Sequence, residues 1–163
     1  MADCLIYWKN CSAELKQFTS NNPGPWNFHY HSKSRHLFEQ IEAGENLWII
    51  VFDTLPPPGD WLLIERISVM EKKHRPEFAR PYQIVGDPKK CLCFDIRKQN
   101  DLTPVLHKLN FVTAKKILAS GAKIARSLQP IRPLTSGDSA LLQRYSKDLP
   151  TVSRLSEMLP TQI

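Results

Sequence analysis

The sequence predicts an α+β fold built on a mostly antiparallel sheet of about five strands, with short helices before and after most of them. Short apolar and aromatic runs bounded by Gly, Pro and Asn recur along the chain, as expected for strands. Most of these runs follow one another between residues 47 and 96, with no helical pattern among them. The helical patterns are short and lie before and after this block, and 163 residues suit one domain with a sizeable core.

The N-terminal part predicts one strand and two short helices. Residues 4–8 combine Leu, Ile, Tyr and Trp, which favours a buried strand. Residues 13–18 predict a short helix that ends at a turn rich in Asn and Pro. Residues 33–41 predict a second helix, whose buried stripe consists of Leu37, Phe38 and Ile41.

The middle part predicts four consecutive strands, at residues 47–52, 61–70, 82–85 and 92–96. The Pro-rich run 56–59 is expected to form an exposed connector. Residues 71–80 carry many charges and predict a loop, and the turn residues 86–90 predict a hairpin between the last two strands. Trp48 and Trp61 lie in strands and are expected in the core.

Beyond the strands, a helix is predicted from Leu102 onwards. Its apolar stripe consists of Val105, Leu106 and Leu109. A second helix is predicted at residues 114–118.

Thr135-x-x-Asp138 resembles a capping box and predicts the start of a final helix. The buried face of this helix is expected to consist of Leu141, Leu142 and Tyr145. We place the domain at residues 1–146 and expect residues 147–163 to form a tail or a short docked helix.

The charge distribution favours an anionic partner. The net charge is +6 and the pI is near 9.2. Residues 60–132 hold fifteen Lys and Arg against seven Asp and Glu, whereas residues 1–59 hold four against six. A basic surface of this kind suits DNA or RNA, and a solvated basic face is the alternative.

Membrane contact and secretion are not indicated. No apolar run is long enough to span a membrane, and the first residues lack the features of a signal peptide. We therefore expect a cytoplasmic protein that does not bind membranes.

Metals and cofactors are not indicated either. The four cysteines include no Cys-x-x-Cys pair and are expected to be reduced and buried. His29, His31 and His36 lie close in sequence, but no acidic or Cys ligands accompany them. We expect no cofactor and no metal.

Known catalytic motifs are missing from the sequence. It contains no Gly-x-Ser-x-Gly, no phosphate-binding Gly-rich loop before Lys-Ser/Thr and no zinc-binding His pair at helical spacing. A site that combines Cys11 with one of the five histidines stays open, because such sets assemble in space. We expect a binding module, not an enzyme.

Residues 26–35 mix aromatic, amide, imidazole and basic side chains after a Pro-Gly-Pro turn. Trp26 suits stacking on a base or covering one end of the sheet, and Asn27 suits reading a base edge or forming a turn. Lys33 and Arg35 begin the predicted helix, where phosphate is favoured, and an internal ion pair is the alternative for Arg35.

Three residues further along the chain are candidates for the same kind of ligand. Tyr82 begins a predicted strand and suits either a pocket wall or an aromatic core pair. Lys115 and Lys116 suit contacts to a nucleic-acid backbone, with a solvated face as the alternative.

Five segments of the chain follow one another in a recognisable order. They are Tyr7-Trp8; Trp26 followed by Arg35; Gly44-Glu45-Asn46-Leu47-Trp48-Ile49-Ile50; Leu109-Asn110-Phe111-Val112-Thr113-Ala114-Lys115-Lys116; and Leu134-Thr135-Ser136-Gly137-Asp138. In this order and spacing, over residues 4–146, they resemble the EVE domains of the PUA-like superfamily. Asn27-Phe28 stand where that family has Gly-Val, and Leu118 stands where it commonly has Trp.

The resemblance implies a pseudo-barrel of five or six strands with a pocket for a flipped or free base, often a modified one, and nucleic acid across a basic surface. The base-binding pocket is then expected to consist of Trp26, Asn27, Phe28, Ser34 and Tyr82. Phosphate is expected to contact Lys33, Arg35, Lys115 and Lys116.

The expected partner is DNA or RNA, with modified bases among the candidate ligands and a protein partner as a further candidate. The alternative function is a small-molecule or protein-interaction module on the same fold, without nucleic-acid binding.

Overall fold

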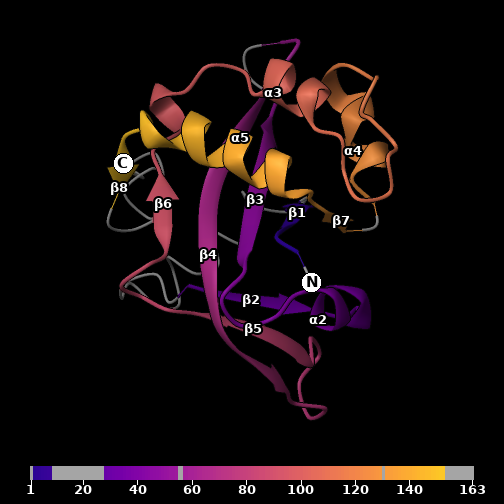
Figure 1. The fold of residues 1–163 in the computed structure, drawn as a ribbon, viewed down its shortest axis with the longest axis vertical. Coiled ribbons are helices and arrows are strands. Elements are labelled where there is room, and N and C mark those ends of the chain that lie inside the picture. The colour runs from indigo at the N-terminus through magenta and orange to yellow at the C-terminus, as the bar shows by residue number, and fades with distance from the viewer. Residues whose placement is uncertain (1, 9–27, 55–56, 130, 153–163) are drawn as a thin grey trace, which may run out of the picture.

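The computed structural model describes residues 2–8, 28–54, 57–129 and 131–152 (Figure 1). The helix expected at residues 13–18, together with Trp26 and Asn27, lies outside these residues. The described part has the predicted α+β class, with a mixed sheet of eight strands and a few short helices.

The strands are β1 (Cys4–Tyr7), β2 (His29–Ser32), β3 (Asn46–Asp53), β4 (Asp60–His74), β5 (Tyr82–Gly86), β6 (Leu92–Phe94), β7 (Arg132–Pro133) and β8 (Thr151–Val152). The helices are α2 (Arg35–Gln40), η1 (Ile96–Lys98), α3 (Thr103–Lys108), η2 (Gly121–Lys123), α4 (Ile124–Ser127) and α5 (Ser136–Lys147).

The main path of the sheet is β2-β5-β4-β3-β1-β7, and β6 and β8 join it beside β4. The sheet is not a closed barrel, because among the described residues this path ends at β2 and at β7 without pairing them. Six of the seven described pairings are antiparallel, and β1 pairs with β3 in parallel. The strand number exceeds the prediction because β2, β7 and β8 are too short for a visible alternation of apolar residues.

Strand β4 connects two parts of the sheet that run in different directions. In Figure 1, β2 and β5 run across the direction of β3 and β4 at the lower end of the molecule. The first residues of β4 pair with β3, and its last residues, Val69 to His74, pair with β5. A register irregularity between Val69 and Glu71 marks the point where the strand leaves one part for the other.

The predicted loop at residues 71–80 is wrong for its first four residues, which continue β4 to His74. Their charged side chains hide the strand in the sequence. Residues 71–74 are nevertheless extended, because the backbone of β5 supplies hydrogen-bond partners for their main chain.

The predicted hairpin between the strands at 82–85 and 92–96 is also wrong. Both strands pair with β4, β5 at Val69–His74 and β6 at Glu65–Arg66. The backbone crosses closely where β5 ends, because a Cβ on Gly86 would lie 2.9 Å from the backbone carbonyl oxygen of Phe28. Glycine is therefore required at this crossing.

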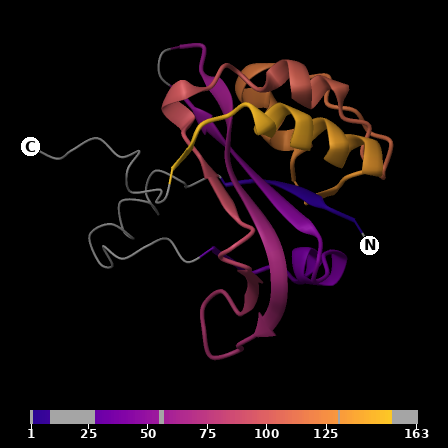
Figure 2. The same ribbon diagram turned by 60° about the vertical axis from the view of Figure 1, so that its left-hand side comes forward.

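Apolar layers cover both faces of the sheet. Figure 2 shows α3, α4 and α5 gathered on one face, where Trp48 and Trp61 are buried as predicted. On the opposite face, α2 contributes Leu37, which packs with Ile64 and Ile84. Folding removes the apolar side chains of both layers from water.

The predicted helix at residues 114–118 is wrong, since the chain from Phe111 to Ser120 is irregular and the helical turns begin at Gly121. Phe111 and Ala114 both have φ of 58°, in the left-handed region that an α-helix excludes. The final helix does begin with the predicted capping box, because Thr135 and Asp138 exchange side-chain to backbone hydrogen bonds. Helix α5 ends at Lys147, and β8 follows it and pairs with β6.

Candidate nucleic-acid interface

The loop between α3 and η2 presents basic and apolar side chains to solvent. We call residues 112–118 the basic loop. Its outward side chains are Val112, Lys115, Lys116 and Leu118, of which Leu118 is 85% exposed. Ile117, by contrast, is fully buried and anchors the loop in the core under α3, α4 and α5.

Arg132 of β7 fixes the shape of the basic loop through hydrogen bonds from its guanidinium. Its guanidinium donates to the carbonyl of Ser127 at 2.7 Å and to the carbonyl of Lys115. It also donates to the hydroxyl of Thr113 at 3.3 Å. Arg132 is 8% exposed, and burial lowers the pKa of its guanidinium from the ordinary value for arginine.

Asp138 of α5 fixes the start of the loop. Its carboxylate accepts hydrogen bonds from the backbone N–H groups of Asn110 and Phe111, each at 2.8 Å, and of Thr135 at 3.0 Å. Burial acts to raise the pKa of Asp138, but these backbone donors outweigh it and hold the pKa below its usual range. The carboxylate therefore stays ionised and keeps the chain turned at Phe111.

Two further hydrogen bonds fix the end of the loop. His107 Nε2 lies 2.7 Å from the carbonyl oxygen of Ala119, and Trp61 Nε1 donates to the carbonyl of Gly121 at 2.9 Å. The loop is thus irregular but held at its start, middle and end by side chains from four elements, α5, β7, α3 and β4. Such over-determined irregular segments are typical of binding sites.

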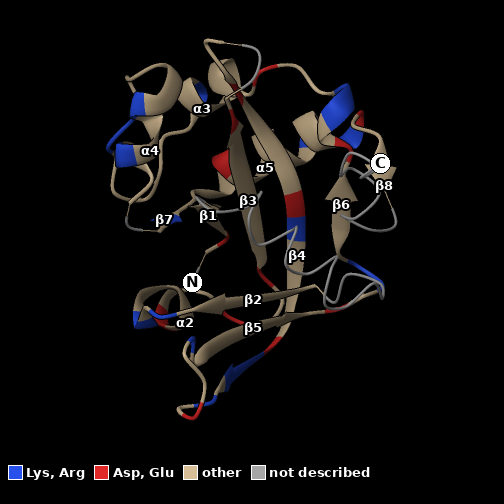
Figure 3. Ribbon diagram, turned by 180° about the vertical axis from the view of Figure 1, so that it is seen from behind, with Lys and Arg blue, Asp and Glu red and all other residues tan. Residues whose placement is uncertain are grey.

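All charged residues in the stretch of sequence around the basic loop are basic. Residues 102–137 contain six Lys and Arg and no Asp or Glu. Figure 3 shows the blue segments of the loop, α4 and β7 at one edge of the molecule. Lys123 and Arg126, next to the loop in η2 and α4, are exposed. The absence of Asp and Glu from residues 102–137 could have indicated this site from the sequence. The sequence did not predict Arg132 and Asp138, which hold the basic loop in place, as site residues.

The predicted pocket residues that the structure describes do not all lie together. Tyr82 is paired with Ser32 at one end of the β2–β5 ladder, whereas the carbonyl of Phe28 accepts a hydrogen bond from Gly86 at the other end. Four residues of strand separate these ends, which is about 13 Å. Phe28 packs against the core on the α2 side.

Tyr82 belongs to an aromatic cluster at the start of β5. The His74 ring stacks on it with centroids 4.8 Å apart, and the Phe38 ring lies 5.5 Å away. Ser34, which is close in sequence to Ser32, is the N-cap of α2 and accepts a hydrogen bond from the N–H of His36 at 3.2 Å.

The two predicted phosphate-binding residues near α2 are on the surface. Lys33 is exposed, and Arg35 forms an ion pair with Glu39 at 2.9 Å in which both side chains are more than half exposed. An exposed pair of this kind is weak, so Arg35 remains available to an anion. Lys115 and Lys116 lie on a different element, so the four predicted phosphate-binding residues form two groups.

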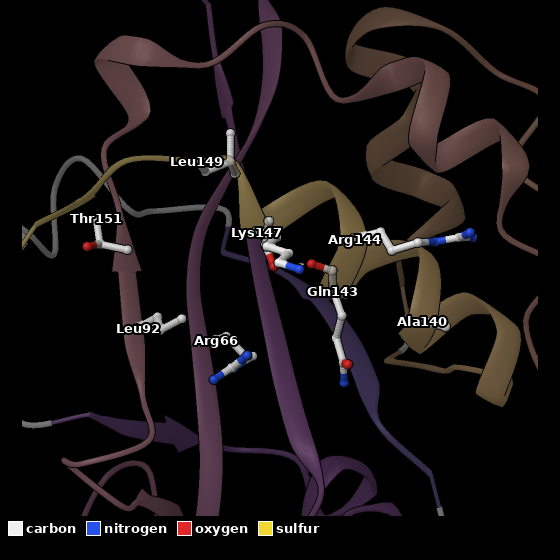
Figure 4. A pocket seen from close by; sticks show the side chains of 9 residues that line it. Arg66, Leu92, Ala140, Gln143, Arg144, Lys147, Leu149 and Thr151 are labelled. Atoms are coloured by element: carbon white, nitrogen blue, oxygen red, sulfur yellow. Dashed lines mark hydrogen bonds between the residues drawn. The ribbon is translucent and has the colours of Figure 1, made fainter.

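A separate open cavity of about 570 Å³ lies between α5 and the strands β4, β6 and β8 (Figure 4). The sheet forms the floor of this cavity. Its strand register places Arg66 of β4 directly between Trp48 of β3 and Leu92 of β6. The lining residues are Arg66, Leu92, Ala140, Gln143, Arg144, Ser146, Lys147, Leu149 and Thr151. None of these nine is acidic.

No family model matches the chain, and a search of characterised proteins finds no similar sequence. Among the described residues, no helix is long and apolar enough to cross a membrane. In the same part of the chain, no group of three or more His, Cys, Asp or Glu side chains is arranged to bind a metal ion.

Proposed function

We propose that this protein is a non-catalytic nucleic-acid-binding module of the PUA-like, EVE type, which binds a flipped base, including modified bases, and contacts the backbone through the basic loop. The observation that carries this proposal is the basic loop. It displays Lys115 and Lys116 on a rigid base of buried Arg132, Asp138 and Ile117.

The charge and shape of the loop suit a polyanion. Phosphate contacts by Lys and Arg supply most of the affinity in non-specific nucleic-acid binding, and a preshaped loop loses little entropy when it binds. Leu118 and Val112 beside the lysines offer apolar surface for sugars or base faces. Apolar side chains in such positions enter the minor groove or the base stack in many DNA-binding proteins.

The fold proposal rests on the bend of β4. We propose that the open sheet is a variant of the PUA-like pseudo-barrel, in which β4 turns from β3 to β5 at the irregularity after Val69. The base would enter near the aromatic cluster of Tyr82, Phe38 and His74, beside Ser34. Trp26 and Asn27, which lie outside the described residues, stay candidates for the pocket from the sequence. Lys33 and Arg35 would hold the phosphate next to that base.

Binding of matched oligonucleotides tests the proposal. The full chain is titrated with DNA and RNA, unmodified or carrying 5-methylcytosine or N6-methyladenine, at low and at physiological salt. We expect binding that weakens steeply with salt, and a preference for one modified form that Trp26→Ala abolishes. Phe78→Ala, which removes an aromatic side chain that is 52% exposed, serves as the matched control and is expected to bind like the unmodified chain.

Two results would contradict the proposal. Absence of binding to every oligonucleotide at low salt would leave the basic loop as a solvated surface. Binding that does not change with salt would indicate a ligand recognised without its phosphates.

A further inference from the structure

We infer that the open cavity under α5 is a second binding site, which takes a small organic anion with its charged group between Arg66 and Lys147. The inference is independent of the nucleic-acid proposal, because no residue of the basic loop lines this cavity. Its volume of about 570 Å³ lies in the range of small-ligand sites.

Arg66 is held in place on the floor of the cavity. Its guanidinium donates to the carbonyl of Lys90 at 2.9 Å, and its Cζ lies 5.9 Å from the centroid of the Trp48 ring. Arg66 forms no ion pair with any described residue, and its buried Nε makes no hydrogen bond. A fixed guanidinium without a carboxylate partner is a ready site for an external anion.

Lys147 provides a second positive charge from the opposite wall. Figure 4 shows Lys147 and Gln143 projecting from α5 on the side of Arg66, while Arg144 points along the helix away from it. Because Lys147 is exposed in the last turn of α5, its ammonium is free to move onto a ligand. Gln143 adds an amide that can donate to the same anion.

The rest of the lining is apolar or neutral, which defines the body of the ligand. Leu92 and Leu149 are half-buried and form an apolar wall, and Thr151 of β8 lies beside it. A planar or apolar group could lie against the two leucines while its carboxylate or phosphate meets Arg66. The fitting class is therefore an organic anion of mononucleotide size or smaller.

Titrations followed by backbone amide chemical shifts test this site on the full chain. The probes are phenyl phosphate, benzoate and AMP, with benzyl alcohol as the neutral analogue and inorganic phosphate as the anion alone. We expect shifts at Leu92, Gln143 and Thr151 with at least one organic anion, and binding at least about tenfold tighter than that of benzyl alcohol. Phenyl phosphate against benzoate separates a phosphate site from a carboxylate site.

Variants of Arg66 and Lys147 test which side chains bind the charged group of the ligand. Arg66→Met keeps the apolar contact with Trp48 and is expected to weaken the anion at least about tenfold. Lys147→Gln, at an exposed position, is expected to weaken anion binding by a smaller factor. Lys98→Gln on η1 and the pair Lys115→Gln with Lys116→Gln are controls that should leave binding unchanged.

Three outcomes would overturn the inference: no organic anion bound at millimolar concentration, equal affinity for benzyl alcohol, or shifts confined to the basic loop. Loss of anion binding in the Lys115 and Lys116 variants would likewise assign the anion to the basic loop. None of these outcomes depends on whether the chain binds oligonucleotides.

Discussion

The guanidinium of Arg132 lies over the ring of Phe111, with its Cζ 3.8 Å from the ring centroid. The same guanidinium binds the carbonyl of Lys115, so one side chain from β7 fixes both the turn that begins the basic loop and its middle. Phe111 is 2% exposed and has a left-handed backbone, which makes this contact part of the core. The position of Lys115 and Lys116 therefore depends on packing that neither lysine takes part in.

Arg132→Lys should loosen the basic loop while keeping the charge. An ammonium cannot donate to both Ser127 and Lys115 in the planar geometry of a guanidinium, and it stacks less well on Phe111. We expect cleavage by trypsin after Lys115 and Lys116 in the native state to become several-fold faster, since proteolysis follows local opening. Limited proteolysis with mass spectrometry measures this.

The control for that experiment is Arg126→Lys, which makes the same exchange at an exposed position of α4. It should leave the cleavage rate at Lys115 and Lys116 unchanged. Equal cleavage rates in the Arg132→Lys variant and the unmodified chain would show that the loop does not depend on Arg132.

Asp138→Asn should destabilise the whole domain. The carboxylate accepts three backbone hydrogen bonds and closes the capping box of α5, and an amide of the same shape presents one acceptor oxygen in place of two. We expect a loss of about 2 kcal/mol or more in the free energy of unfolding, measured by urea denaturation near neutral pH. Glu77→Gln in the exposed turn after β4 should cost far less.

The pH dependence of stability has a defined sign at Asp138. Its folded pKa is depressed, so its stabilising contribution is present above the unfolded pKa of about 3.9. That contribution is lost as the pH falls below this value through the folded pKa. Urea midpoints between about pH 5 and pH 2 should therefore fall less steeply in Asp138→Asn than in the unmodified chain, and parallel curves would contradict this role.

The thiols of Cys4 and Cys91 should react slowly in the folded protein. Burial raises the pKa of Cys4 from 9.0 to about 12, and burial likewise raises that of Cys91 to about 11. Near pH 8 the thiolate fraction of Cys4 is then reduced roughly 1000-fold, before any steric protection. Site-resolved alkylation by iodoacetamide should be slow at both residues until urea unfolds the chain, and native rates equal to unfolded rates would contradict this burial.

The parts of the fold that could be predicted are those with a strong local pattern. The strands that contain Trp48 and Trp61 bury long apolar runs, and the capping box of Thr135 and Asp138 defines the start of α5 within a few residues. The pairing of the strands could not be predicted in the same way. The turn at residues 86–90 has the composition of a hairpin, but β5 and β6 pair with separate stretches of the same long strand, β4, and this long-range pairing leaves no local pattern in the sequence.

The candidate site could be predicted in its exposed members and not in its supports. Lys115 and Lys116 are visible as a basic pair, yet their rigidity comes from Arg132 and Asp138, 16 or more residues further along the chain. The expected helix at residues 114–118 fails for the same reason, since long-range contacts at Phe111 and Ile117 override local helix propensity. The cavity with Arg66 and Lys147 likewise exists only where α5 meets β4, β6 and β8 in space.

The salt dependence of oligonucleotide affinity, measured for the unmodified chain and for the double variant Lys115→Gln with Lys116→Gln, tests the central claim most directly. The matched control is Lys89→Gln with Lys90→Gln, a second exposed Lys-Lys pair in the turn before β6. If the basic loop binds the backbone, the slope of log affinity against log salt should decrease in magnitude by about 2 in the first variant and stay unchanged in the control. Equal slopes in all three proteins would contradict the account and remove the basic loop from the interface.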